Sequence, residues 1–503
     1  REAARRGRFP RPEDVSRYTP RPWQPPITNG ILKHKRVNML APMGSGKSAG
    51  TLAALSTLFL FGEVKRVLII APKRVAQYTW PEALHKFRES FGHLTMATAI
   101  GDSDERHAAI RSRAFIVTIN FENLEWLVEH YGPEWPFDMV VVDESTKLRG
   151  LRVSIGTSKT GKKFLRGAGA VDENGKAKKK KGSGASRARA LARVAHTRVD
   201  RWVNLTGTFV LSGLEAAWGQ TWFVDTGHRL GNSFDGFSKR WFYAKPGSDA
   251  TRQQIEPLPF AQEQIMNAIR DVTVVVNLKD YIDIAEPFVN HIYIDLPADA
   301  MRQYKEMARD LLTEIQGTTI EALAAGAKSQ KLLQIASGSV YTGNEKDWVL
   351  AHDEKIEALK SVIEEAAGMP VLVANWFKPD AERIKKVFGK DALDLSKNAD
   401  LEAAKRGEGL VWIAHPLSLG HGVDGLQQHC HSVCFFSTNW FAEEDAQLIE
   451  RIGPTRQMQA GFDRVVTVHR IIARGTVEES AVKRLTTKVS VQDALIEGLK
   501  ETA

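Results

Sequence analysis

The segment VNMLAPMGSGKSAGTLAAL (37–55) places a lysine and a serine directly after a short loop that contains glycine. Glycines let backbone N–H groups turn toward a phosphate, and the N-terminus of a following helix adds its positive end. Lys47 is placed to reach the β- and γ-phosphates of a nucleotide, and the Ser48 hydroxyl to hold Mg²⁺. The loop that would surround the phosphates consists of Met43, Gly44, Ser45 and Gly46.

A second motif closes the apolar run MVVVDESTK (139–147). Asp143, at the carboxyl end of a strand, can bind Mg²⁺ through water, and Glu144 can orient and deprotonate an attacking water. An acidic pair in a surface turn is the alternative interpretation. The order of the motifs favours hydrolysis of a nucleoside triphosphate, although Ala41 stands where the strict loop pattern has glycine.

The length and composition of the chain are typical of a soluble protein with several domains. A chain of 503 residues with 43% hydrophobic and 26% charged residues predicts a soluble protein of two to four domains. No run approaches the roughly 18 apolar residues of a membrane span, so we expect no membrane partner. Two cysteines fit a reducing compartment, and the arginine- and proline-rich start lacks the apolar core of a signal peptide. We therefore expect a cytoplasmic location.

The positive charge is concentrated in one segment. Residues 158–201 hold fourteen Lys and Arg against three acids, a net +11, so the rest of the chain sums to −2 of the total +9. Such a segment favours contact with phosphates of a nucleic acid, and a solvated loop is the alternative. Its densest run is Lys178, Lys179, Lys180 and Lys181.

Short, continuous apolar runs alternate with amphipathic stretches, which predicts buried parallel strands and helices. In the first half the strands fall at 37–40, 66–71, 114–119, 139–143 and 202–207, and in the second at 371–375, 410–414, 432–437 and 465–472. We expect two tandem α/β domains, at 1–290 and 291–503. The first carries a basic insertion at about 151–185 and a helical one at about 215–285, and the second a helical insertion at about 298–345.

Several motifs in one order resemble the Swi/Snf-type DNA-dependent ATPases of helicase superfamily 2, and the compact length resembles phage-encoded members. The resemblance covers about 21 to 488 and includes RPWQ, APKRVAQYTWPEAL, VTINFENL, DESTKLRG, NLTGTFVLSGLEAAW, VLVANWFKPDAERI and SLGHGVDGLQQ. It implies RecA-like P-loop domains, Gln24 on the adenine, and Pro72 and Lys73 among the nucleic-acid contacts. Thr146 and Phe209 depart from the family's histidine and proline.

The resemblance also implies residues that couple the two domains. They are Thr206, Gly207 and Thr208 in the third motif, Gly422 and Asp424 in the fifth, and Gln447 in the sixth. A turn-capping role is the alternative for Asp424.

Two arginines flank a Gly-Pro turn in QLIERIGPTRQ (447–457). An arginine inserted at the γ-phosphate stabilises the negative charge of phosphoryl transfer. Arg451 falls in register with the family motif, whereas the second family arginine would land on Pro454, two residues before Arg456. We expect Arg451 to contribute and Arg456 to take the displaced role, with plain surface charge as the alternative.

The leading expectation is a DNA translocase that hydrolyses ATP with Mg²⁺ between its two domains and moves on duplex or branched DNA. A strand-separating helicase on DNA or RNA is the alternative enzyme. A nucleotide-gated DNA-binding or recruitment protein is the alternative of another class. We expect a monomer in the cytoplasm of a bacterium or a phage-infected host. The sequence names no protein partner.

Overall fold

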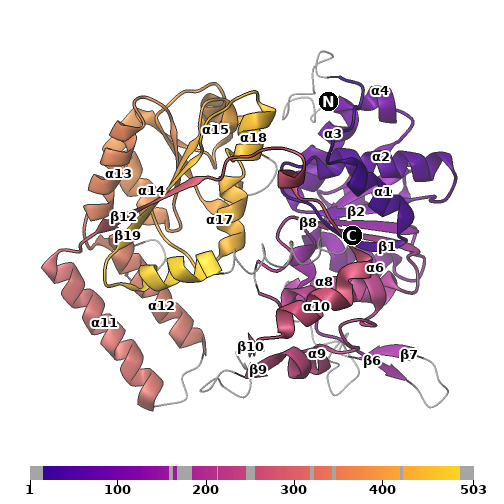
Figure 1. Cartoon of the computed structure of the whole chain (residues 1–503), viewed down its shortest axis with the longest axis horizontal. Helices are drawn as coiled ribbons and strands as arrows, with labels where there is room; N and C mark the ends of the chain where they lie inside the picture. The colour runs from indigo at the N-terminus through magenta and orange to yellow at the C-terminus, as the bar shows by residue number, and fades with distance from the viewer. Residues whose placement is uncertain are drawn as a thin grey trace. The chain divides into compact units, whose positions relative to one another are not determined.

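The structure is a computed structural model that describes residues 15–157, 163–166, 184–211, 213–244, 255–317, 322–342, 347–419 and 423–487. Figure 1 follows the chain by colour from indigo to yellow. Within the described residues, 15–244 and 255–282 form one compact unit, and 283–487 form another. We call these units the first and the second domain.

The first domain is built on a seven-stranded sheet of order β11-β1-β8-β5-β2-β4-β3, in which every pairing is parallel. All residues of β2, β4 and β8 are buried, as expected for parallel strands covered on both faces. The strands are β1 (Arg36–Leu40), β2 (Val67–Ala71), β3 (Met96–Ala99), β4 (Ile116–Asn120), β5 (Met139–Asp143), β8 (Arg201–Thr206) and β11 (Thr273–Val275).

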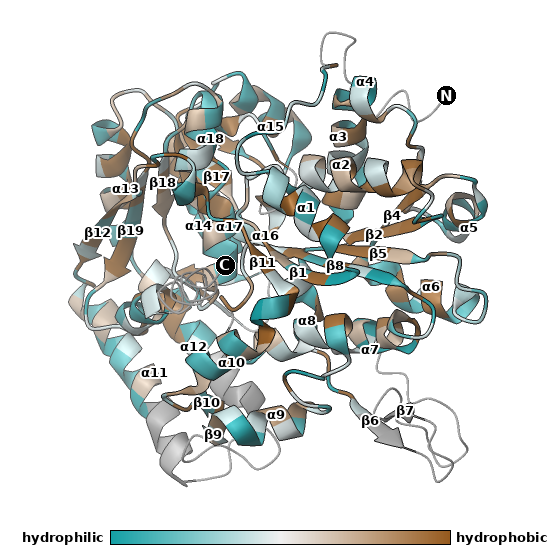
Figure 2. Cartoon of the chain, turned by 45° about the vertical axis from the view of Figure 1, so that its right-hand side comes forward, coloured by the Kyte–Doolittle hydropathy of each residue, from teal (hydrophilic) through white to brown (hydrophobic). Residues whose placement is uncertain are grey.

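Helices lie on both sides of this sheet. In Figure 2, α1 (Pro25–Lys33), α2 (Lys47–Leu60) and α3 (Trp80–Lys86) are on one side, and α6 (Leu124–Tyr131), α7 (Gly184–Ala195) and α8 (Ala216–Asp225) on the other. The apolar strands between them are coloured as hydrophobic. The remaining α-helices are α4 (Arg88–Phe91), α5 (Ser103–Arg111), α9 (Phe234–Trp241) and α10 (Ala261–Ile269).

The two predicted insertions of the first domain contain short strands. The antiparallel pair β6 (Ser154–Thr157) and β7 (Lys163–Arg166) falls in the basic insertion, and Lys178 to Lys181 lie outside the described residues. The predicted helical insertion at 215–285 holds α8, α9 and α10. It also holds the antiparallel pair β9 (Phe242–Ala244) and β10 (Ile255–Pro257), and β11 of the main sheet.

The second domain has a six-stranded parallel sheet of order β12-β19-β18-β15-β17-β16. Alternate residues of its strands point to opposite faces and pack into two hydrophobic cores. Val373, Ile413 and Cys434 pack on one face, and Leu372, Trp412 and Val433 on the other. The strands are β12 (Phe288–Ile294), β15 (Val371–Ala374), β16 (Ala392–Asp394), β17 (Val411–Ala414), β18 (Ser432–Phe435) and β19 (Thr467–Ala473).

Helices cover both faces of the second sheet. Side chains of α13 (Glu354–Glu365) and α14 (Lys378–Phe388) enter one core, and those of α15 (Asn398–Lys405) and α17 (Ala442–Ile449) enter the other. The chain also forms α11 (Ala298–Gly317), α12 (Ala322–Ser337), α16 (Pro416–Leu419) and α18 (Pro454–Gln459), and the strand pair β13 (Ser339–Tyr341) and β14 (Trp348–Leu350).

The predicted fold class, two tandem α/β domains with parallel sheets flanked by helices, is confirmed. The predicted junction at 290/291 falls inside β12, a strand of the second sheet. No helix among the described residues is long and apolar enough to cross a membrane.

Candidate nucleotide-binding site

The predicted phosphate loop joins β1 to α2, with Lys47 as the first residue of the helix. Gly44 and Gly46 have φ values of 76° and 77°, a left-handed conformation that glycine adopts without steric cost. The Lys47 ammonium donates to the carbonyl oxygens of Ala41 at 3.0 Å and Pro42 at 3.3 Å. The lysine side chain therefore folds back over the loop that it would share with a phosphate.

Trp23 and Gln24, just before α1, hold the same loop. The Trp23 indole Nε1 donates to the Ser45 carbonyl at 2.9 Å, and the Gln24 Nε2 donates to the Gly46 carbonyl at 3.2 Å. A Cβ added to Gly46 would lie 2.3 Å from that Nε2 and would displace the Gln24 amide, and the left-handed backbone at Gly46 also favours glycine. Gln24, which the resemblance puts on an adenine, thus contacts the phosphate loop itself.

The acidic pair ends β5, as predicted. The Asp143 Oδ2 accepts a hydrogen bond at 3.0 Å from the indole Nε1 of Trp80. The pKa of Asp143 is raised to about 6, mainly by burial and also by the Glu144 charge, while the nearby Lys47 charge lowers it. The carboxylate lies close enough to the loop lysine for the two charges to interact, as a shared metal and phosphate site requires.

Glu144 has an unusual backbone. Its φ of 67° lies in the left-handed region, which is uncommon for a residue other than glycine and costs of the order of 1–3 kcal/mol. The side chain is buried, and its Oε1 accepts from the hydroxyls of Thr208 at 3.3 Å and Thr146 at 3.4 Å. Thr146, which replaces the family's histidine, therefore contacts the predicted base directly.

Sheet order brings three of the predicted motifs together. The loop, residues 206–208 and the acidic pair follow the consecutive strands β1, β8 and β5, whose carboxyl ends share one edge. The Ala41 N–H donates to the Thr206 carbonyl at 3.0 Å, and a Cβ on Gly207 would lie 3.1 Å from the Met43 nitrogen. Polar groups that converge at this edge are typical of ligand sites in open α/β sheets.

In the second domain the two arginines have different surroundings. Arg451 is buried; its Nε donates to the Gln447 carbonyl at 3.2 Å and its Nη1 to the Val423 carbonyl at 3.1 Å. Arg456 forms an ion pair with the exposed Asp424. The Gly-Pro turn between them is the start of α18, with Gly453 as its cap and Pro454 as its first residue. Gly422 lies outside the described residues.

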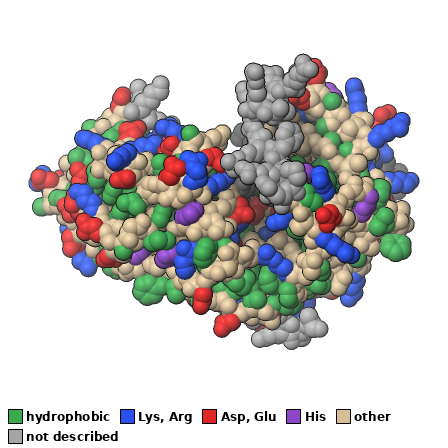
Figure 3. Space-filling view, turned by 90° about the horizontal axis from the view of Figure 1, so that it is seen from above, with side chains coloured by type: hydrophobic (Ala, Val, Ile, Leu, Met, Phe, Trp, Pro, Cys, Tyr) green, Lys and Arg blue, Asp and Glu red, His purple; other side chains and the backbone are tan. Residues whose placement is uncertain are grey.

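The predicted nucleic-acid contacts are described only in part. Pro72 and Lys73 follow β2 directly, and Lys73 is exposed. On the face shown in Figure 3, blue Lys and Arg side chains lie interspersed with red Asp and Glu. That face shows a mixed charge pattern of the kind expected on an ordinary soluble surface.

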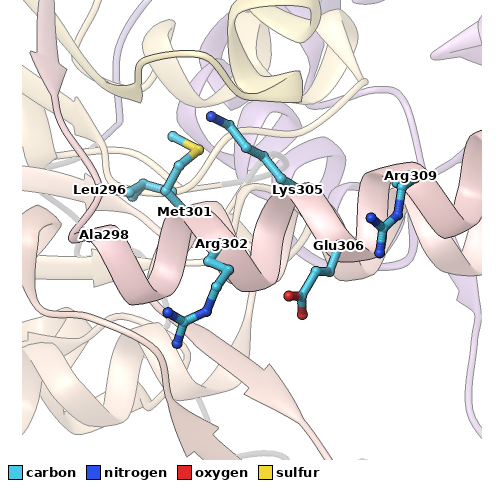
Figure 4. Close-up of a pocket in the computed structure, with 7 residues that line it drawn as sticks. All are labelled: Leu296, Ala298, Met301, Arg302, Lys305, Glu306 and Arg309. Carbon is cyan, nitrogen blue, oxygen red and sulfur yellow. The ribbon is translucent and has the colours of Figure 1, made fainter.

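An open groove of about 690 Å³ lies along α11 in the second domain. Figure 4 shows Lys305 on one side of the helix and Arg302 and Glu306 on the other. Leu296, Met301 and Arg309 also line the groove, and none of the predicted site residues does. This groove therefore lies apart from the predicted site residues.

Sequence reasoning missed the contacts that hold the site residues. Trp80 and Trp23 belong to quoted motifs that give no role to either indole, and no motif contains Tyr18, whose hydroxyl donates to the Gln24 Oε1 at 3.3 Å. A hydrogen bond between side chains 63 residues apart, such as Trp80 to Asp143, leaves no local signal. The one available hint was the tryptophan next to Pro81 inside a helical pattern.

Fold and site together define a two-domain α/β protein whose β1–α2 loop has the left-handed glycines and the lysine predicted for a phosphate-binding loop. No family model matches the chain. It is 42% identical over 487 residues to the protein described as "Putative protein p41" of Acyrthosiphon pisum secondary endosymbiont phage 1, a match that covers 96% of this chain and 99% of the phage protein. The chain belongs to the family of this phage protein.

Two solved structures are also similar. The SWI2/SNF2 ATPase core of Sulfolobus solfataricus in complex with dsDNA is 17% identical, with a TM-score of 0.41, and the match covers 98% of this chain and 96% of that one. The SWI2/SNF2 ATPase core domain of the same organism is 18% identical, with a TM-score of 0.39 and coverages of 96% and 92%.

Proposed function

We propose that this chain is a Swi/Snf-type, DNA-dependent ATPase of helicase superfamily 2 that moves along duplex or branched DNA. One observation carries the ATPase part of the proposal: the phosphate loop, residues 206–208 and the acidic pair end three consecutive parallel strands and are joined by hydrogen bonds. Sequence motifs in family order support the DNA-dependent part.

In this proposal the first domain binds the nucleotide. Residues 43–46 surround the phosphates, and Lys47 leaves the carbonyls of Ala41 and Pro42 for the β- and γ-phosphates. Ser48 and Asp143 hold Mg²⁺, which offsets the phosphate charge when bound. Glu144 orients the attacking water and accepts its proton, and Thr208 and Thr146 hold the base in place.

The second domain supplies positive charge to the γ-phosphate when the domains close, through Arg451, Arg456 or both. Thr206, Thr208, Asp424 and Gln447 take part in coupling that closure to hydrolysis. The protein binds DNA mainly through the phosphates of the DNA backbone. Pro72, Lys73 and the basic run at 178–181 are among the residues that contact it. Repeated closing and opening would move the protein along one strand of a duplex.

The first test is the ATPase rate of the full chain with no nucleic acid and with single-stranded, duplex and branched DNA and RNA. We expect DNA to stimulate the rate. We expect Lys47→Ala to reduce the rate to background, because the phosphates lose their lysine, and Glu144→Gln to lower it about 10²–10⁴-fold while nucleotide binding remains. Lys65→Ala, an exposed lysine before β2, is the matched control.

A normal rate in Lys47→Ala would remove the phosphate-loop assignment. Two assays distinguish a translocase from a helicase: displacement of the third strand of a triplex, and unwinding of a labelled duplex. Displacement without unwinding would support the translocase. Unchanged biological activity in Glu144→Gln would favour a nucleotide-gated DNA-binding protein, in which turnover is incidental.

A further inference from the structure

The segment after β2 contains a π-helical turn, η3 (Val75–Thr79), which leads into α3. The Trp80 N–H donates to the Val75 carbonyl, five residues back, where an α-helix would use Ala76. Pro81 has no N–H to offer. The Ala76 carbonyl therefore loses both backbone donors that a continuing helix would supply.

A side chain of the sheet satisfies this carbonyl. The Thr118 hydroxyl, from the middle of β4, donates to the Ala76 carbonyl at 2.7 Å, and both residues are buried. A buried carbonyl without a partner costs of the order of 1–3 kcal/mol, so this contact stabilises the π turn. The sheet thus holds the turn in one conformation.

The π turn determines which way Trp80 points. It adds one residue to a helical turn, and each helical residue advances the side chains by about 100°. The Trp80 side chain is fully buried, and its indole Nε1 reaches the Asp143 Oδ2 at 3.0 Å. The indole nitrogen of tryptophan can only donate, so the Asp143 oxygen in this contact must be the acceptor.

We propose that Trp80 is a positioning residue for Asp143: its indole N–H holds Oδ2, so that Oδ1 is presented to Mg²⁺ and its water shell. Thr118 and the π turn hold Trp80 in place. This inference rests on the proposed function, because it needs Asp143 to serve a metal. Hydrogen-bond partners of metal-binding groups typically contribute about 10–100-fold to metal affinity.

The test measures how the affinity of the full chain for fluorescent ADP depends on the Mg²⁺ concentration. Trp80→Phe keeps an aromatic ring and removes the donor. We expect the Mg²⁺ concentration that gives half of the full increase in ADP affinity to rise about 10–100-fold in this variant. The ADP affinity measured in EDTA, without Mg²⁺, should not change. Trp218→Phe is the matched control, because Trp218 is buried in the same domain and donates its indole N–H to Gly231 at 3.0 Å.

Thr118→Val is a second variant that keeps the shape of the residue and releases the Ala76 carbonyl. We expect a shift in the same direction, and this variant decides the matter if Trp80→Phe does not fold. A wild-type Mg²⁺ dependence in a folded Trp80→Phe protein would overturn the role of Trp80 alone. If wild-type protein showed no Mg²⁺-dependent binding of ADP, both the proposed function and this inference would fall.

Discussion

Arg451 and Arg456 have different hydrogen-bond partners, and this difference predicts a larger contribution to stability from Arg451 than from Arg456. Arg451 is buried between backbone carbonyls, which would be left without these donors if the side chain were removed. Arg456 contacts Asp424, whose side chain is 74% exposed. An ion pair with such an exposed partner contributes only about 0–1 kcal/mol to stability.

We predict that Arg451→Ala lowers both the ATPase rate and the free energy of unfolding, the latter by about 1–3 kcal/mol. We predict that Arg456→Ala lowers the rate with little change in the melting temperature; loss of an arginine at the γ-phosphate costs about 10³–10⁵ in rate. Rates and thermal melts of both variants check this, with Arg406→Ala, which removes an exposed pair with Glu408, as control. Near-normal ATPase rates in both variants would contradict a role for either arginine at the γ-phosphate.

His352 connects stability to pH. It is buried before α13, and its Nε2 contacts the Ile335 carbonyl at 3.0 Å. The pKa of His352 is lowered to about 4, mainly by burial and also by the charges of Lys355 and Arg383, while the hydrogen bond with the Ile335 carbonyl raises it. Because the folded pKa lies below the usual 6.5, the histidine's contribution is complete above pH 6.5 and is lost as the pH falls toward 4.

We predict that His352→Gln reduces the loss of thermal stability between pH 7 and pH 5, by up to about 2 kcal/mol, since one pKa unit corresponds to about 1.4 kcal/mol. The neighbouring Asp380 acts in the opposite direction, because burial raises its pKa to about 6. The comparison is therefore between variant and wild type at each pH. The exposed His228→Gln is the control, and an identical pH dependence in His352→Gln would contradict the prediction.

At the scale of elements, one buried ion pair joins α13 to the end of the second sheet. The Lys355 ammonium donates to the carbonyls of Phe436 and Ile471 at 2.9 Å and to the Glu478 carboxylate at 2.7 Å, and both charged side chains are fully buried. The other Glu478 oxygen accepts from the Ala473 N–H at 2.9 Å. Removing one partner leaves a buried charge without its counter-ion.

We predict that Lys355→Met lowers the stability of the second domain by about 3–5 kcal/mol, measured by denaturant unfolding. Adding Glu478→Gln to this variant should recover much of the loss, because no unpaired charge remains. Lys360→Met on the same helix, which breaks an exposed pair with Glu357, should cost under about 1 kcal/mol. Equal losses from Lys355→Met and Lys360→Met would argue against a role for burial.

The sequence predicted those strands that are buried and apolar along their length. β2, β5 and β15 were found within one residue of their ends, because continuous apolar runs signal central parallel strands. β3 and β12 were missed. β3 consists of partly exposed residues, and β12 (FVNHIYI), which contains the predicted domain boundary at 290/291, has a mixed pattern in place of a continuous apolar run.

At the scale of the whole molecule, local spacing predicted where the candidate site residues lie in the fold but not their hydrogen-bond partners. The phosphate loop and the acidic pair are each contiguous motifs, and they lie after β1 and at the end of β5 as their order predicts. The contacts of Gln24 with Gly46, Thr208 with Glu144 and Thr118 with Ala76 join residues distant in sequence, which only the sheet order brings together. The basic run at 178–181 lies outside the described residues, so its role stays a prediction.

The position of β12 has a consequence for synthesis on the ribosome. β12 is the first strand of the second sheet to be made and β19 the last, yet β19 is its neighbour in that sheet. Until β19 emerges, β12 has no strand to pair with, and its Phe288, Val289 and Tyr293 side chains remain largely exposed even after pairing. The second domain therefore completes its sheet only after β19 has been made, and a nascent chain stopped before residue 467 carries β12 as an unpaired strand with exposed apolar side chains.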